Sequence, residues 1–229
     1  MNFPILSTII FIPLLGAAFI FLSSQKTESK SGIYISLFTS IANLLLTLFL
    51  WYSFNNSLNG FQFVEEKNWI SGFIKFKLGI DGISILFIVL TAFITPICII
   101  SCINSVKTRL NEFLIAILIL ETFILGVFCS LDLIIFYLFF EAGLIPMFLI
   151  IGIWGGPRKI YSAYKFFLFT LLGSVLMLAA IIFIYWAIGT TDYTEIYKLK
   201  IPKDYQYLLW LAFFSSFAVK TPMWPVHTW

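Results

Sequence analysis

Four charged side chains interrupt apolar stretches of the sequence, and their types suit proton transfer. Glu121 and Glu141 lie near the middle of two such stretches, Lys165 lies about one turn into a third, and Lys220 ends a fourth. A charged side chain at the centre of a membrane helix costs about 2.5–3.5 kcal/mol, so such residues normally pair, face water or carry protons. In a low-dielectric environment a carboxylate binds a proton more readily and a lysine loses one more readily, whereas an ion pair opposes both changes. A Glu–Lys pair that forms and separates can therefore load and release a proton.

Prolines stand close to two of these charges. Pro146 follows Glu141 by five positions, and Lys220 is followed by Pro222 and Pro225. Proline breaks or kinks a helix, and discontinuous helices recur at the ion sites of transporters, where they line a cavity. A structural role, in which a Glu–Lys pair only fastens two helices together, stays open.

Two further candidates for proton transfer, Lys165 and His227, have less specific sequence surroundings. Lys165 could extend along its helix and place its amine at the membrane interface. His227, just past the break at Lys220, could relay a proton.

The composition indicates a membrane protein without a cofactor of its own. Hydrophobic residues make up 61% of the 229 positions and charged residues only 11%, against about 25% charged in soluble domains. The single histidine, the three cysteines and the lack of a Gly-rich phosphate loop predict no haem, metal or nucleotide site in this chain. The small net charge of +3 predicts no nucleic-acid partner.

The apolar stretches are long enough to span a bilayer, which requires roughly 20 residues per helix. We expect an all-α polytopic membrane protein with about seven transmembrane helices, the last broken at Pro222 and Pro225, in a single membrane domain over residues 1–229. Period-2 alternation at 61–64 and 73–78, on either side of 65–72, predicts a small surface hairpin within residues 55–79. The expected spans are 4–22, 33–54, 82–103, 112–130, 132–153 and 162–188, and one that starts near 205.

The basic residues of the loops predict an orientation. Positively charged residues in short loops favour the cytoplasmic or matrix side. The first, third and fifth loops are short and basic, whereas the other loops spread a similar number of lysines over longer segments. We therefore expect the odd-numbered loops to be cytoplasmic or matrix-facing and the N-terminus to lie on the opposite side. The basic residues of the odd-numbered loops are Lys26, Lys30, Lys107, Arg109, Arg158 and Lys159.

Three sequence motifs lie in or near these apolar stretches. Residues 136–147 read Phe-Tyr-Leu-Phe-Phe-Glu-Ala-Gly-Leu-Ile-Pro-Met, residues 78–84 read Leu-Gly-Ile-Asp-Gly-Ile-Ser, and residues 217–229 carry Lys-Thr-Pro-Met-Trp-Pro. In this order they resemble the antiporter-like membrane subunits of respiratory complex I, the proton-pumping NADH:quinone oxidoreductase. The Glu-x-x-Leu-Ile-Pro-Met form is similar to the M type of these subunits.

The resemblance implies a fold and a role. Members of this family have about twice as many spans, in inverted repeats of five helices, so the chain would be the incomplete N-terminal half of the fold. Glu141 and Lys220 would form the input half of a proton channel, with Lys165 as a partner, and Glu121 matches an acid of the fourth span. The family carries no cofactor: NADH and quinone bind through partner subunits. The partners would be other membrane-arm subunits of complex I, in the bacterial inner (cell) membrane or the mitochondrial inner membrane.

Three other functions remain open at this point. A subunit of a multi-subunit Na⁺/H⁺ antiporter would share these motifs, and the sequence does not decide whether H⁺ or Na⁺ is moved. A structural anchor of the membrane arm would need no transport residues. A membrane-embedded transferase with His227 as its base would need a loop of clustered polar residues, which none of the loops supplies.

Overall fold

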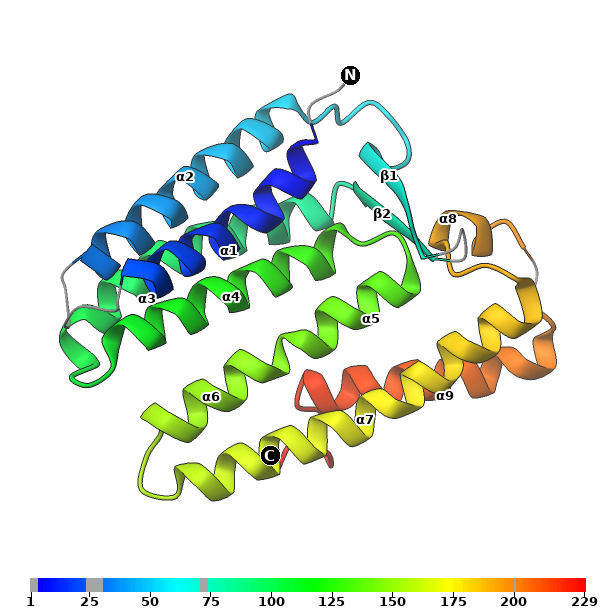
Figure 1. Cartoon of the computed structure of the whole chain (residues 1–229). Helices are drawn as coiled ribbons and strands as arrows, with labels where there is room; N and C mark the ends of the chain where they lie inside the picture. The colour runs from blue at the N-terminus through cyan, green and yellow to red at the C-terminus, as the bar shows by residue number, and fades with distance from the viewer. Residues whose placement is uncertain (1–3, 24–30, 71–73, 200) are drawn as a thin grey trace. The chain divides into compact units, whose positions relative to one another are not determined.

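The computed structural model describes residues 4–23, 31–70, 74–199 and 201–229, which are mostly helical (Figure 1). The helices are α1 (Ile5–Ser23), α2 (Ser31–Ser53), α3 (Ser84–Ser105), α4 (Leu110–Cys129), α5 (Leu133–Ala142), α6 (Leu144–Trp154), α7 (Lys159–Ile188), α8 (Tyr193–Ile196) and α9 (Lys203–Lys220). The two strands are β1 (Gln62–Ile70) and β2 (Ile74–Ile80), which pair with each other. The chain divides into two compact units, one containing α1–α4 and the other α5–α9. The expectation of a single membrane domain over 1–229 stays a prediction.

The first unit is a bundle of α1–α4, in which each helix packs along at least two of the others. Gly16 lets α1 approach α2 closely, because a Cβ atom at this position would lie 2.6 Å from Cγ2 of Thr39. Its apolar core lies between α1, α3 and α4 and contains Ala17, Ile99 and Leu118. By contrast, the buried face of α2 consists mainly of small and polar residues.

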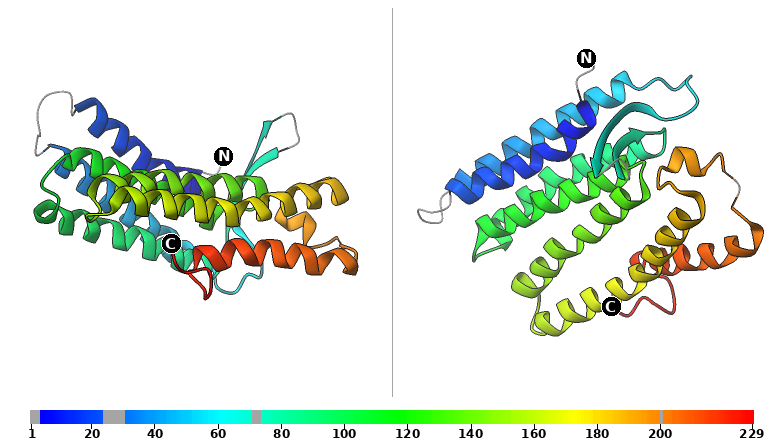
Figure 2. Two further views of the ribbon diagram at one scale, coloured as in Figure 1. Left: turned by 90° about the horizontal axis from the view of Figure 1, so that it is seen from below. Right: turned by 45° about the vertical axis from the view of Figure 1, so that its right-hand side comes forward.

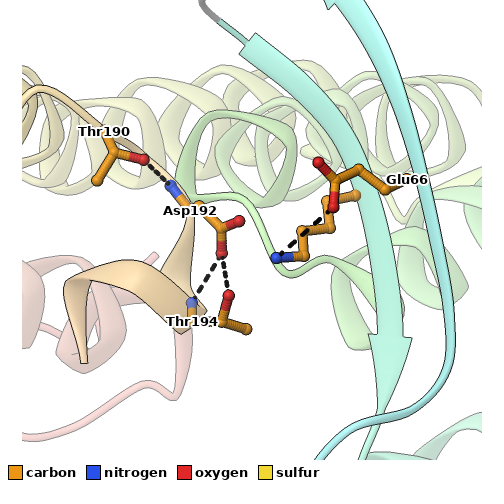
Figure 3. A network of polar contacts seen from close by, with 5 residues as sticks. Glu66, Thr190, Asp192 and Thr194 are labelled. Carbon is orange, nitrogen blue, oxygen red and sulfur yellow. Dashed lines mark hydrogen bonds and ion pairs between the residues drawn. The ribbon is translucent and has the colours of Figure 1, made fainter. Parts of the chain in front are cut away.

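The strands confirm the hairpin predicted between the second and third spans, with longer strands than expected. β1 begins one residue after the predicted start and continues through Ile70, into the segment expected to be the turn. Glu65 on β1 caps the beginning of α1, since its Oε1 accepts from the amide of Leu6 at 2.7 Å and its Oε2 from the amide of Ser7 at 3.1 Å. Its neighbour Glu66 lies 4.0 Å from the amine of Lys77, the ion pair drawn in Figure 3.

The second unit contains the interrupted span expected near Glu141. α5 and α6 are separated by Gly143 alone and together form a 22-residue apolar span, Leu133–Trp154. The expected span 132–153 is thus present, with its interruption three residues before Pro146. Pro146 is the third residue of α6, and in the first turn of a helix its missing N–H breaks no helical hydrogen bond.

Two loops of the second unit fix the beginning of α5 against the end of α7. The amide of Leu133 donates to the carbonyl of Thr191, and the amide of Tyr193 donates to the carbonyl of Leu131, both at 2.9 Å. Asp132 caps α5, and its second carboxylate oxygen accepts from Thr191 Oγ1 at 2.6 Å. Figure 3 shows the adjoining turn, in which Asp192 accepts from the amide and the hydroxyl of Thr194.

Among the described residues, six helices are long and apolar enough to span a membrane: α1, α2, α3, α4, the α5–α6 segment and α7. These six match the first six predicted spans. α9 begins at Lys203, close to the predicted start near 205, and ends at Lys220, two residues before Pro222. α7 and α9 lie side by side in both views of Figure 2.

Candidate functional site

Lys220 is the last residue of α9, and its ammonium group is held by the end of α5. Its Nζ donates to the backbone carbonyl of Phe140 at 3.2 Å and lies 4.0 Å from the centre of the Phe140 ring. The carbonyls of the last turn of a helix lack partners within the helix, so this carbonyl is free to accept. A cation at the C-terminal end of two helices is also favoured by their dipoles. The interruption at Gly143 and the end of α9 thus create one binding place for the lysine.

Glu141 follows Phe140 directly, so the structure brings the predicted Glu–Lys pair together. The opposite charges of Glu141 and Lys220 attract each other, but no hydrogen bond or direct ion pair joins them within the described residues. One carboxylate oxygen of Glu141, Oε1, is buried and accepts no hydrogen bond from any described residue. This oxygen can therefore accept a further hydrogen bond, for example from water.

One polar residue of α7, Ser174, lies beside this pair, and other buried polar residues lie nearby along α7 and α9. Ser174 is buried beside the Glu141 carboxylate, and its hydroxyl donates to the carbonyl of Leu171 at 2.9 Å. Thr170, one turn earlier on α7, is buried as well, and so is Ser216 on α9, whose Oγ has no partner among the described residues. These hydroxyls can each accept a hydrogen bond from water or from a protonated acid.

The close approach of α7 to α9 places these groups at short range. A Cβ atom on Gly173 would lie 2.9 Å from Cγ2 of Val219, the residue before Lys220. Glycine at position 173 therefore allows the two helix backbones to approach near the lysine.

Lys165 on α7 contacts the segment that follows Lys220, and His227 belongs to that segment. The amine of Lys165 donates to the backbone carbonyl of Thr228, and Phe166 packs edge-on against Trp229 with ring centres 5.0 Å apart. Trp229 in turn donates to the carbonyl of Val219 at 2.8 Å. The structure thus gives Lys165 a backbone partner, and its predicted membership of the Glu141–Lys220 network stays a prediction. His227 is exposed.

Glu121 belongs to the first unit and has a partner that the sequence reasoning missed. It is only 2% exposed, and its Oε1 accepts from Nδ2 of Asn43 on α2 at 2.9 Å. The signal was present in the sequence, because Ser36, Ser40, Asn43 and Thr47 recur at spacings of four, three and four and so share one helix face. Ser174 and Ser216 were also missed, because single serines in apolar helices carry no pattern.

No group of three or more His, Cys, Asp or Glu side chains suited to a metal ion occurs in the part of the chain that the structure describes. The prediction that the chain holds no metal or cofactor remains a prediction. What the arrangement offers chemically is a carboxylate, an ammonium group and hydroxyls in apolar surroundings, which are groups that exchange protons.

Comparison with known proteins shows which proteins this chain resembles. The family model described as "NADH:quinone oxidoreductase/Mrp antiporter, TM" matches residues 130–229. The chain is 28% identical to a chain of "Respiratory complex I from Thermus thermophilus with bound NADH", with a TM-score of 0.85 over 98% of this chain and 45% of that one. A chain of an archaeal membrane-bound sulfane sulfur reductase, at 23% identity and a TM-score of 0.78 over 96% of this chain and 34% of that one, shares the fold. Residues 130–229 are thus similar to this family of membrane proteins.

Curated relatives narrow this class. The chain is 48% identical to NADH-quinone oxidoreductase subunit M of Rhodobacter capsulatus, over 98% of this chain and 47% of that protein. It is 50% identical to NADH-ubiquinone oxidoreductase chain 4 of Marchantia polymorpha, over 98% of this chain and 46% of that protein. The homologues are therefore of the subunit M or chain 4 type. The chain spans about half the length of these relatives.

Proposed function

We propose that this chain is part of a proton-translocating membrane subunit of an NADH:quinone oxidoreductase, in which Glu141 and Lys220 exchange the proton. The observation that carries the proposal is the position of Lys220, held on the carbonyl and ring of Phe140, directly beside a carboxylate with an unpartnered buried oxygen. Subunit M and chain 4, the relatives at 48% and 50% identity, are named as subunits of such oxidoreductases. The chain itself would have no redox site.

The geometry suggests a two-position mechanism for the lysine. While the Lys220 ammonium lies next to Glu141, its positive charge favours the ionised carboxylate. When the ammonium moves away, the isolated carboxylate in its apolar surroundings takes a proton from hydronium and leaves water. Ser174 and Ser216 would support that water by accepting hydrogen bonds. Return of the ammonium then expels the proton, and Lys165 would belong to the same network further along α7.

The other chains of the complex would supply the energy. Neighbouring membrane-arm subunits would be the direct partners, and NADH and quinone would bind to partner subunits only. The place of action would be the bacterial inner (cell) membrane or the mitochondrial inner membrane, in agreement with the bacterial and plant relatives. Glu121, in the first unit, would take part in proton transfer separately from this pair.

The proposal is tested by substitution in the whole complex reconstituted in liposomes. Glu141→Gln and Lys220→Ala are expected to leave assembly intact and to depress NADH-driven proton uptake. Matched controls are Glu195→Gln and Lys203→Ala, which change an exposed acid and an exposed lysine of the same unit. Normal turnover and pumping in an assembled Glu141→Gln complex would overturn the assignment and leave the structural-anchor role.

A Na⁺/H⁺ antiporter subunit is the second candidate, because the matching family model describes both groups of proteins. Proton uptake by the complex in sodium-free medium separates the two. Uptake that persists without sodium supports the proton, whereas uptake that requires sodium supports the antiporter.

A further inference from the structure

Glu121 is a carboxyl group without a cation in its own bundle. The four helices α1–α4 carry only two charged side chains along their lengths, Glu112 and Glu121. Glu112 lies in the first turn of α4 and is paired with Arg109, which precedes that helix. Glu121 is nine residues further, about 14 Å along the axis, and 2% exposed. An ionised carboxylate there would have no cation to offset its desolvation cost, which favours the neutral acid.

Asn43 is arranged to bind the neutral acid. The amide is fully buried and donates from Nδ2 to Oε1 of Glu121. Two acceptor oxygens beside this bond, Oδ1 of Asn43 and Oε2 of Glu121, have no hydrogen-bond partner among the described residues. A proton on Oε2 turns one of these acceptors into a donor, and Oδ1 is the acceptor that it needs, directly or through one water molecule. An ionised acid would leave both oxygens unsatisfied.

A buried polar face of α2 extends on both sides of Asn43. Ser36, Ser40, Asn43 and Thr47 are fully buried and share one face of the helix. Each of the three hydroxyls donates to the carbonyl three residues earlier, at 2.8–3.1 Å. Their oxygen lone pairs therefore remain available to accept hydrogen bonds from water. From the start of α2 at Ser31 to Asn43 the helix rises about 18 Å, which joins a helix end to the middle of the bundle.

We propose that Glu121 and Asn43 form a second proton-holding site, within the α1–α4 unit, that exchanges its proton with water along the polar face of α2. Loading transfers one proton from hydronium to Oε2 and leaves water, and unloading reverses this step without any change of oxidation state. The inference deepens the proposed function, because it concerns proton transfer by the same subunit, but it depends on different residues.

The protonated acid is tested by infrared spectroscopy of the whole complex in lipid. A protonated carboxyl group has a C=O band separate from the carboxylate bands, and this band shifts when the proton is exchanged for deuterium. We expect Glu121→Gln to remove one such band and the control Glu112→Gln to leave it. Asn43→Leu should move the band to higher frequency, because Oε1 loses its donor; Asn43→Ser serves the same purpose if the leucine variant does not assemble. An unchanged band in Glu121→Gln would overturn the proposal, as would a sodium-dependent carboxylate band in its place.

The path is tested by the rate of deuterium exchange of the same band. Ser40→Ala is expected to slow the exchange severalfold, and Ser105→Ala, an exposed hydroxyl at the end of α3, is expected to leave it unchanged. Equal rates in both variants would overturn the path along α2. In Glu141→Gln the Glu121 band is expected to persist whatever happens to pumping. Failure of the Glu141–Lys220 mechanism therefore shows in proton uptake, and failure of the second site shows in the band.

Discussion

The Lys220 ammonium is positioned by Phe140, one residue away from the carboxylate with which it would exchange charge. A carbonyl at 3.2 Å and a ring at 4.0 Å satisfy the cation without a direct ion pair to Glu141. A closed, fully hydrogen-bonded buried ion pair would be costly to separate, since breaking one commonly costs several kcal/mol. A lysine that rests on a neutral carbonyl and ring can instead move toward or away from the acid at a smaller cost.

The Phe140 ring provides the first test of this arrangement. Phe140→Leu removes the cation–π contact, which contributes about 0.5–2 kcal/mol, and leaves the backbone carbonyl in place. We expect a partial loss of proton uptake per NADH, smaller than in Lys220→Ala. Phe136→Leu is the matched control, because this ring stacks on Phe140, whereas the Lys220 amine lies over the Phe140 ring itself. Equal losses in both variants would mean that aromatic packing, rather than the lysine contact, is responsible.

At the residue scale, the sequence predicted the charged groups and missed the neutral ones. Glu141 and Lys220 could be recognised because a charge in an apolar helix is costly and each stands near a proline. Asn43 lies in an equally apolar helix, but one hydrogen bond to Glu121, 78 positions away, offsets the cost of burying its amide. Such a pairing depends on how α2 packs against α4, which one sequence does not reveal.

Gly173 lies at a close approach between α7 and α9. Gly173→Ala would place a Cβ atom 2.9 Å from Cγ2 and 3.1 Å from Cβ of Val219, a stiff side chain next to Lys220. We expect a loss of about 1–3 kcal/mol in stability, measured by thermal denaturation in detergent, together with reduced pumping. Val219→Ala in the same chain should restore much of the stability.

Gly152→Ala is the control for this substitution. The added Cβ atom would lie 3.5 Å from Cβ of Ala163, an ordinary contact, so little change is expected. A destabilisation as large as that of Gly173→Ala would show that general helix packing, and not the contact with Val219, limits the stability.

The beginning of α3 depends on Asp81. Its Oδ1 accepts from the amide of Ser84 at 2.7 Å, from the Ser84 hydroxyl at 2.7 Å and from the amide of Ile83 at 3.2 Å. Burial opposes ionisation of Asp81, but these hydrogen bonds outweigh it and hold the pKa below its ordinary value of 3.8. Asp81→Ala is expected to cost about 0.5–2 kcal/mol at neutral pH, measured by thermal denaturation, and Asp204→Ala, an exposed acid of α9, much less.

The pH dependence of this effect has a definite sign. Because the pKa of Asp81 is lower in the folded chain than in the unfolded chain, the carboxylate stabilises the fold fully above the unfolded value. This stability is lost as the pH falls through the lower, folded pKa. The difference in stability between the parent chain and Asp81→Ala should therefore shrink below about pH 4. A difference that stays constant down to pH 2 would show that the carboxylate's charge has no part in it.

At the element scale, the lengths of the apolar stretches predicted the elements better than the local residue patterns did. The six membrane helices were predicted to within a few residues, because the bilayer requires about 20 apolar residues for each. The interruption near Glu141 was expected from Pro146, and the structure places it at Gly143 instead. The extent of β1 was underestimated, because Glu65–Trp69 lack the alternation that marks a half-buried strand and are held by pairing with β2.

At the scale of the whole molecule, the placement of basic residues predicts how the six spans are oriented. Short loops rich in lysine and arginine stay on the cytoplasmic or matrix side. The loops at Thr108 and Gly156 should therefore lie on that side, and the segments at Asn56 and Tyr197 on the other.

A single cysteine at each position, with the three native cysteines replaced by alanine, can be labelled with a membrane-impermeant thiol reagent in sealed vesicles of known orientation. Position 156 suits this test because a side chain there meets open space. In vesicles with the cytoplasmic face outward, the reagent should label the cysteines at positions 108 and 156 and not those at positions 56 and 197. The reverse pattern would invert the predicted orientation. Two spans, α4 and the α5–α6 segment, separate the loops at 108 and 156, so the chain must return to the same side. Labelling of Thr108→Cys and Gly156→Cys from opposite sides would therefore contradict the six-span topology.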